Sequence, residues 1–322
     1  MEASEDDAEL VQLTGSQAEQ FARIEQLWPE FGHSLQVLAA SEGGGMGWRT
    51  VDGVEYLTRY TQENGKKKGR SLGRRSPETE AIMEQFDSTV LKARRIRREY
   101  REDVLLTCKL AKAYGIARLH GRFAHTLDWL WYTDASRRLS LFGGSALLAY
   151  ESASGILAPT ALVKDQHLQF VARTEDIETL NLDEITEACD VDNEGATYRY
   201  NDDRFLIRSK ADKRLLAEIF LPTYFVRRLD GDAHDALHDM LRQPGLKAMT
   251  FSRDTRPIEL TALDPRTYAV AAHCMRDSEI WAQRAEFACA VVKHRWPDDF
   301  DRVQEMIFEA DPESGSMTLR GP

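Results

Sequence analysis

The stretch LFGGSALLAYE, residues 141–151, runs from an apolar strand end through a Gly-Gly-Ser turn into a helix. Glycines let the backbone approach a phosphate closely, and the free N–H groups at a helix start attract an anion. The Ser145 hydroxyl adds a further donor. We therefore expect Gly143, Gly144 and Ser145 to bind the phosphates of a nucleotide. The turn is not a Walker loop, because no Gly-Lys-Ser/Thr follows at the required spacing.

Three carboxylates further along the chain suggest a metal site. Asp176 and Glu178 flank Ile177, and acids at i and i+2 of a strand point to the same side of the sheet. Glu218 interrupts the apolar run Leu215–Leu221, where an unpaired buried acid would cost several kcal/mol. Since Mg²⁺ prefers carboxylate oxygens, we expect these three acids to be catalytic and to hold two Mg²⁺ ions.

Each of these signals has a plainer interpretation when it is taken alone. A Gly-Gly-Ser sequence before a helix is more often a simple turn, and an Asp-x-Glu triplet is usually a solvated strand edge. Their order in the chain, the apolar residues before each and the lone acid Glu218 favour the joint interpretation. That interpretation is transfer of a nucleotide with no protein nucleophile.

The bulk composition limits the class of protein. The 322 residues carry a net charge of −11, which argues against a general DNA coat, because binding to a nucleic-acid backbone is mainly cationic. The four cysteines form no CxxC pair and are expected to be reduced thiols of a cytoplasmic protein. The acidic N-terminus lacks the apolar core of a signal peptide, and no apolar run has the ~20 residues needed to cross a bilayer.

The pattern along the chain predicts an α/β (α+β) fold, with a small mixed twisted sheet between helical flanks. We expect a disordered acidic tail over 1–15 and an N-terminal helical region over 16–137. That region contains a β-hairpin, with Asp52-Gly53 as its turn, and a basic loop over 66–75. The core covers 138–262, and a C-terminal helical region covers 263–322.

Two basic runs, residues 66–75 and 92–101, have two interpretations. The second is most simply a solvated helix face. Both also suit a cationic surface for an RNA acceptor or a triphosphate, because arginine makes bidentate phosphate contacts. Within the first run we expect Arg74 and Arg75 to contact the nucleotide.

Phe142-Gly143-Gly144-Ser145 followed by Asp176-Ile177-Glu178 resembles the signature of the DNA polymerase β-like minimal nucleotidyltransferase superfamily. The chain is more closely similar to a bacterial family of predicted nucleotidyltransferases within it, over about residues 48–290. The most specific part of that resemblance is Ser71-Leu72-Gly73-Arg74-Arg75-Ser76-Pro77-Glu78-Thr79-Glu80. Glu218 stands where an Asp is usual in this family.

The resemblance implies a small twisted mixed sheet flanked by helices, Mg²⁺, and an NTP that donates its NMP to a hydroxyl with release of pyrophosphate. The acceptor would be an RNA such as tRNA, a protein or a small molecule. A partner protein or self-association, and a toxin–antitoxin or phage-defence role, also fit such stand-alone enzymes. The departure at Glu218 keeps a second interpretation open, a catalytically inert module that binds a nucleotide or a partner. An RNA-binding regulator acting through the basic runs is the third.

Overall fold

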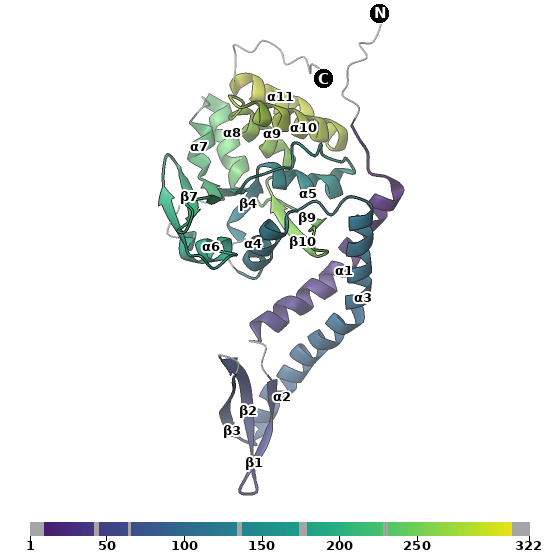
Figure 1. The fold of residues 1–322 in the computed structure, drawn as a ribbon, viewed down its shortest axis with the longest axis vertical. Helices are drawn as coiled ribbons and strands as arrows, with labels where there is room; N and C mark the ends of the chain where they lie inside the picture. The colour runs from purple at the N-terminus through teal and green to yellow at the C-terminus, as the bar shows by residue number, and fades with distance from the viewer. Residues whose placement is uncertain are drawn as a thin grey trace, which may run out of the picture. The chain divides into compact units, whose positions relative to one another are not determined.

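The computed structural model describes residues 10–41, 45–63, 66–133, 137–173, 179–227, 229 and 231–310. The chain forms two compact units, one made of residues 1–21 and 108–322 and the other of residues 22–107. We call these the sheet unit and the hairpin unit. Each contains helices packed with a β-sheet, so the fold is mixed α/β of the α+β kind, as predicted (Figure 1).

The boundaries between the units fall inside two helices, α1 (Gly15–Ala40) and α3 (Lys92–Ala113). The other elements of the hairpin unit are β1 (Gly45–Val51), β2 (Val54–Glu63), β3 (Lys66–Arg74), α2 (Pro77–Phe86) and the π-helical turn η1 (Asp87–Leu91). The strands of the sheet unit are β4 (Leu139–Phe142), β5 (Leu168–Ala172), β6 (Ala196–Tyr200), β7 (Arg204–Ser209), β8 (Leu215–Phe220), β9 (Leu246–Phe251) and β10 (Pro257–Ala262). Its helices are α4 (Gly121–Trp131), α5 (Gly144–Ser154), α6 (Leu182–Cys189), α7 (Pro222–Val226), α8 (Gly231–Arg242), α9 (Pro265–His273), α10 (Glu279–Arg295) and α11 (Pro297–Ala310).

In the hairpin unit, β1, β2 and β3 form an antiparallel sheet in that order. The predicted hairpin is confirmed: Asp52 and Gly53 both have positive φ, as the tight turn between β1 and β2 requires. The predicted basic loop is wrong, because Lys66–Arg74 is the strand β3 and pairs with β2 along its length. Strand pairing uses backbone groups, so a charged, exposed sequence does not prevent it.

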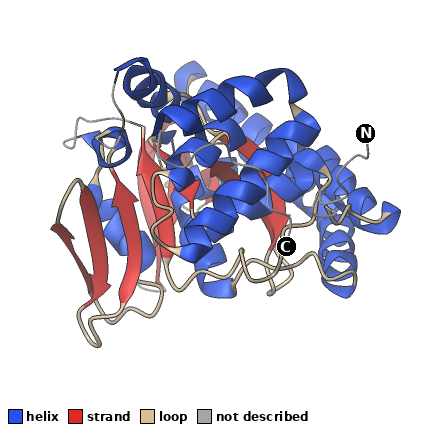
Figure 2. Ribbon diagram, turned by 90° about the horizontal axis from the view of Figure 1, so that it is seen from above, coloured by secondary structure: helices blue, strands red, loops and turns tan. Residues whose placement is uncertain are grey.

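The sheet unit is built on seven strands in the order β6-β7-β8-β5-β4-β10-β9. At its centre β4 runs antiparallel to β5, and β5 runs parallel to β8. Figure 1 shows α4 and α6 together on one side of this unit, with α8, α9, α10 and α11 on the other. Figure 2 gives a second view, in which blue helices lie against the central red strands, while the strands at one edge extend beyond the helices. The central strands β4 and β5 are therefore covered, and their residues are buried and, apart from Ser140 and Gln169, apolar.

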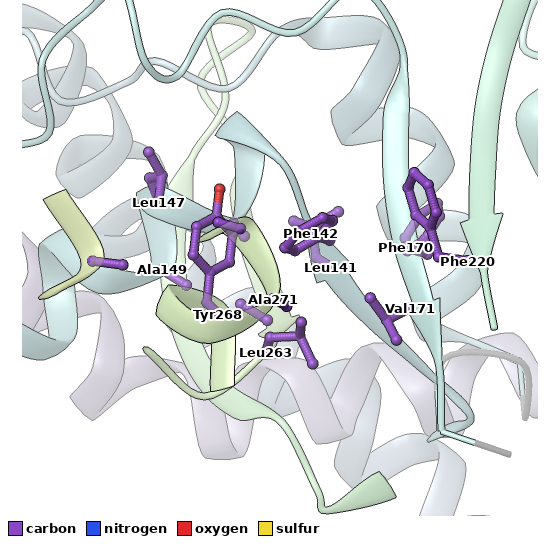
Figure 3. Packing of buried hydrophobic residues seen from close by; sticks show 14 of the residues in the cluster. Leu141, Phe142, Leu147, Ala149, Phe170, Val171, Phe220, Leu263, Tyr268 and Ala271 are labelled. Atoms are coloured by element: carbon purple, nitrogen blue, oxygen red, sulfur yellow. The ribbon is translucent and has the colours of Figure 1, made fainter. Parts of the chain in front are cut away.

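Phe142, the last residue of β4, lies at the centre of the core. Its ring stacks on Trp281 at 4.7 Å between centroids and lies 4.9 Å from the ring of Tyr268. Figure 3 shows Phe142 and Tyr268 together, with Phe220 of β8 further along the sheet. Aromatic burial of this kind dominates core energetics, so the chain is held firmly at the residue before Gly143.

The expected disordered tail over 1–15 is wrong for its last residues. Gln12 forms a bridge with Ile156, and Leu13 N–H donates to the Gly155 carbonyl at 2.8 Å. Residues 1–9 lie outside the described part of the chain. None of the helices that the structure describes is both long enough and apolar enough to cross a membrane.

Candidate functional site

The predicted Gly-Gly-Ser turn joins β4 to α5. Gly143 has φ 73° and ψ −164°, a conformation that a residue with a side chain rarely adopts. A Cβ at this position would also collide with the side chain of Gln169 on β5. The Gly143 carbonyl accepts a hydrogen bond from the Tyr268 hydroxyl at 3.0 Å, which fixes the turn from the side of α9. Gly143, Gly144 and Ser145 thus form a rigid helix start, as predicted.

A carboxylate of this chain occupies the start of α5. Asp165 Oδ1 accepts from the Gly144 N–H at 3.0 Å, and Oδ2 accepts from the Ser145 N–H at 2.6 Å. The Ser145 hydroxyl also donates to Oδ2 at 2.9 Å. An acidic group is favoured here because it meets free N–H groups and the positive end of the helix dipole. The donors expected for a phosphate are therefore already satisfied from within the chain.

Arg284 on α10 balances the charge of Asp165. Its Nη2 lies 2.6 Å from Asp165 Oδ1, and both side chains are 4% exposed. The Nε of Arg284 donates to the Leu162 carbonyl at 3.0 Å, and its guanidinium lies over the ring of Trp281. A carboxylate this deeply buried requires such a partner, so Asp165 and Arg284 act as one unit.

Glu218, the predicted third carboxylate, lies on β8 beside the Gly-Gly-Ser turn, with Gln169 between them. Its Oε2 is 2.9 Å from His167 Nε2 and accepts from Gln169 Nε2 at 3.2 Å. Its Oε1 accepts from Arg204 Nη1 at 3.1 Å. Burial raises the pKa of Glu218, but the hydrogen bonds from His167 and Gln169 and the charge of Arg204 lower it further, below its usual value. The guanidinium of Arg204 is a counter-charge for this buried acid.

Asp176 and Glu178, the predicted metal pair, lie outside the described residues. The last residue described before them is Arg173, whose N–H donates to the Arg138 carbonyl at 2.8 Å. In the antiparallel β4–β5 pair, Gln169 faces Phe142 and Ala172 faces Leu139. Arg173 is therefore at the opposite end of this strand pair from Gly143.

Arg74 and Arg75, expected at the nucleotide, belong to the hairpin unit, whereas Gly143–Ser145 belongs to the sheet unit. The Arg75 guanidinium pairs with Glu55 at 2.8 Å and with Glu80 at 2.7 Å. The Nε of Arg74 donates to the Tyr56 hydroxyl at 3.2 Å. Both side chains make contacts that stabilise the packing of β2, β3 and α2.

A pocket of about 670 Å³ opens beside the start of α5. Ser145 and Asp165 line it, together with the basic side chains of Arg118, Lys164 and Arg253. Because Asp165 is neutralised by Arg284, the charge left in the lining is positive. The volume lies within the usual range for small-molecule sites, roughly 300–1,000 Å³.

Five residues of this region are not predicted from the sequence: Asp165, His167, Gln169, Arg204 and Arg284. The alternation of polar His167 and Gln169 around buried Leu168 was a usable signal, because it places two polar side chains on one sheet face beside Glu218. Asp165 and Arg284 are separated by 119 positions and carried no local signal.

The chain matches no protein-family model, no curated protein and no solved structure in the comparisons made with it. Within the part of the chain that the structure describes, no three side chains of His, Cys, Asp or Glu are grouped so that they could hold a metal ion.

Proposed function

We propose that this chain is a nucleotide-binding module with the fold of the polymerase β-like nucleotidyltransferases. The arrangement of β4, the glycine turn, α5, an antiparallel β5 and a parallel β8 supports that fold. The observation that carries the binding function is the pocket beside Ser145 with its cationic lining. A nucleotide offers a matching anion and a flat apolar base, for which Phe123 and Leu148 provide apolar lining.

Lys164 and Arg253 are the side chains proposed to contact the phosphates. Both are exposed and line the pocket. The Arg253 Nε donates to the Arg118 carbonyl at 3.2 Å, which holds this arginine at the rim. Arg118 itself pairs with the buried Glu151, so its role is to support the pocket wall.

The test is titration of the full chain with ATP, GTP and pyrophosphate by isothermal calorimetry. We expect saturable binding that weakens at least about tenfold in the double variant Lys164→Ala/Arg253→Ala, because each lost charged contact costs about 1.5–3 kcal/mol. Lys247→Ala is the control, since Lys247 is an exposed lysine on β9 of the same unit. Absence of binding, or equal affinity in the double variant and the wild type, contradicts the proposal.

A second candidate is the full transferase, in which Asp176, Glu178 and Glu218 hold two Mg²⁺ ions and an NMP moves to an acceptor hydroxyl. The observation in its favour is the buried carboxylate of Glu218 close to the Gly-Gly-Ser turn. Incubation with labelled NTPs, Mg²⁺ and total RNA or protein would detect transfer. Label that appears with the wild type and vanishes in Asp176→Ala would establish the enzyme in place of the module.

RNA binding by the hairpin unit is separable from both candidates. Arg94, Arg95, Arg97, Arg98 and Arg101 are all exposed on α3. An electrophoretic shift of RNA that is unchanged in Asp176→Ala and weakened in Arg94→Ala/Arg95→Ala would assign this surface to RNA. Without such a shift, the surface is a solvated helix face.

A further inference from the structure

Four polar side chains gather on one face of the central sheet, and we call them the β5–β8 cluster: His167, Gln169, Arg204 and Glu218. Strand register explains the grouping. Gln169 faces Glu218 in the parallel β5–β8 pair, and Leu206 faces Glu218 in the antiparallel β7–β8 pair. Arg204 is two residues from Leu206 and therefore lies on the same face.

This set of side chains does not fit Mg²⁺. The ion takes oxygen ligands, and carboxylates provide them best. Glu218 is the single acid of the cluster, and both of its oxygens already accept hydrogen bonds from His167, Gln169 and Arg204. The groups that meet this carboxylate are N–H donors, and one of them carries a permanent positive charge, which repels a divalent cation.

The same set fits an anion. The Glu218 side chain is 10% exposed, whereas that of His167 is 21% exposed and that of Arg204 is 28% exposed. The cluster therefore presents its basic groups to solvent and keeps its acid inside. One guanidinium nitrogen of Arg204, Nη1, donates to Glu218, and the side chain as a whole is 28% exposed, so further N–H donors of the guanidinium remain for a ligand. An arginine with unused donors is well suited to a phosphate.

The cluster is also next to the proposed nucleotide site. Gln169 bonds Glu218 with its amide nitrogen and lies so close to Gly143 that no Cβ fits between them. Gly143 in turn precedes Gly144 and Ser145, which start α5 at the pocket. The Gln169 side chain therefore links the turn beside the pocket to the cluster.

We propose that the β5–β8 cluster binds a phosphate group of the nucleotide directly, with Arg204 supplying the positive charge and the His167 ring beside it, so that binding requires no divalent cation. This inference rests on the proposed function and adds to it the chemistry of the phosphate subsite. It assigns Arg204 and His167 as binding residues and Glu218 as the group that positions them.

The experiment measures ATP and pyrophosphate binding to the full chain by calorimetry, once with excess Mg²⁺ and once with EDTA. We expect affinities in the two buffers that agree within about threefold, well under the tenfold that 1.4 kcal/mol represents. Arg204→Gln should weaken binding about tenfold or more in EDTA, as expected for the loss of a charge-assisted contact. Arg199→Gln, which alters an exposed arginine of β6, should bind as the wild type does.

The double variant His167→Asp/Gln169→Asp tests whether the cluster binds a cation once its neutral side chains are replaced by carboxylates. It would place two more carboxylates beside Glu218, and their mutual repulsion is relieved by a bound cation. We expect this variant to show a rise in melting temperature with Mg²⁺ that the wild type lacks. Arg204→Lys keeps the positive charge and should retain more affinity than Arg204→Gln, which separates loss of charge from misfolding.

Two results would overturn the inference. Binding that disappears in EDTA and is unaffected by Arg204→Gln, but still weakens in Lys164→Ala/Arg253→Ala, would leave the nucleotide-binding module intact and remove its metal independence. No binding in either buffer would overturn both the module and the subsite.

Discussion

Arg284 Nη2 lies 2.6 Å from Asp165 Oδ1, and this buried ion pair fixes the start of α5. The two residues lie far apart in sequence, on α10 and on the segment before β5. The Asp165 carboxylate satisfies the N–H groups of Gly144 and Ser145 only while its own charge is compensated. The stability of the turn therefore depends on a residue near the end of the chain.

Arg284→Ala should be strongly destabilising, because it leaves the Asp165 carboxylate buried without a counter-charge. We expect a loss of about 3–5 kcal/mol in the free energy of unfolding, measured by urea denaturation. Arg302→Ala is the control, because Arg302 is an exposed residue on α11, and this variant should change the free energy of unfolding by less than about 0.5 kcal/mol. Combining Arg284→Ala with Asp165→Asn should recover part of the loss, and a double variant less stable than Arg284→Ala alone would contradict the pairing.

Gly143→Ala should destabilise more than Gly155→Ala, although both glycines have nearly the same positive φ, 73° and 76°. A Cβ at Gly155 meets nothing within 4 Å, so that variant costs only the backbone strain, about 1 kcal/mol. At Gly143 the backbone (φ 73°, ψ −164°) lies in a region that only glycine adopts readily, whereas Gly155 (φ 76°, ψ 11°) is left-handed helical. The Cβ at Gly143 also collides with Gln169, so we expect about 2–3 kcal/mol in total. Equal melting temperatures for the two variants would contradict both the backbone strain at Gly143 and the cost of the collision with Gln169.

Ser76→Ala tests the cap at the start of α2. The Ser76 hydroxyl accepts from the Thr79 N–H, and the Thr79 hydroxyl accepts from the Ser76 N–H at 2.9 Å. Removing this cap should cost about 1 kcal/mol. Ser88→Ala is the matched control, because the Ser88 hydroxyl donates to the Gln85 carbonyl at an exposed position. Hydrogen exchange of the α2 amides would report the effect locally, and unchanged protection there would contradict the assigned cap.

The sequence predicts the local features of this fold well. The Gly-Gly-Ser turn and the Asp52-Gly53 hairpin both depend on backbone conformations that a few neighbouring residues determine. Glu218 was placed correctly on an apolar strand because an acid among aliphatic residues is conspicuous.

The partners of Glu218 could not be predicted in the same way. Glu218 meets His167, Gln169 and Arg204 because β5 and β7 pair with β8. The order of strands in a sheet cannot be predicted from the sequence of any single strand. The strand β3 was missed because a run of lysine and arginine gives no apolar alternation, although its backbone pairs normally with β2. Long-range pairing thus determined the contacts within the site, and the pattern of charge alone did not reveal the strand β3.

Glu151 should make the stability of the sheet unit fall as pH rises. Burial raises the pKa of Glu151 to about 7, against the opposing effects of Arg118 and the Ala158 N–H. A carboxyl whose pKa is higher in the folded state binds more protons there than in the unfolded chain. Its contribution to stability is therefore greatest below its usual pKa of 4.5 and decreases as pH rises from there to about 7.

The check is a comparison of Glu151→Gln with the wild type across this pH range, using urea denaturation at each pH. The glutamine cannot titrate, so the free energy of unfolding of the wild type should fall more steeply, by up to about 3 kcal/mol over the range, than that of the variant. Glu187→Gln, an exposed acid on α6, should leave the wild-type slope unchanged. Parallel curves for Glu151→Gln and the wild type would show that Arg118, 2.5 Å away, keeps this carboxylate charged throughout.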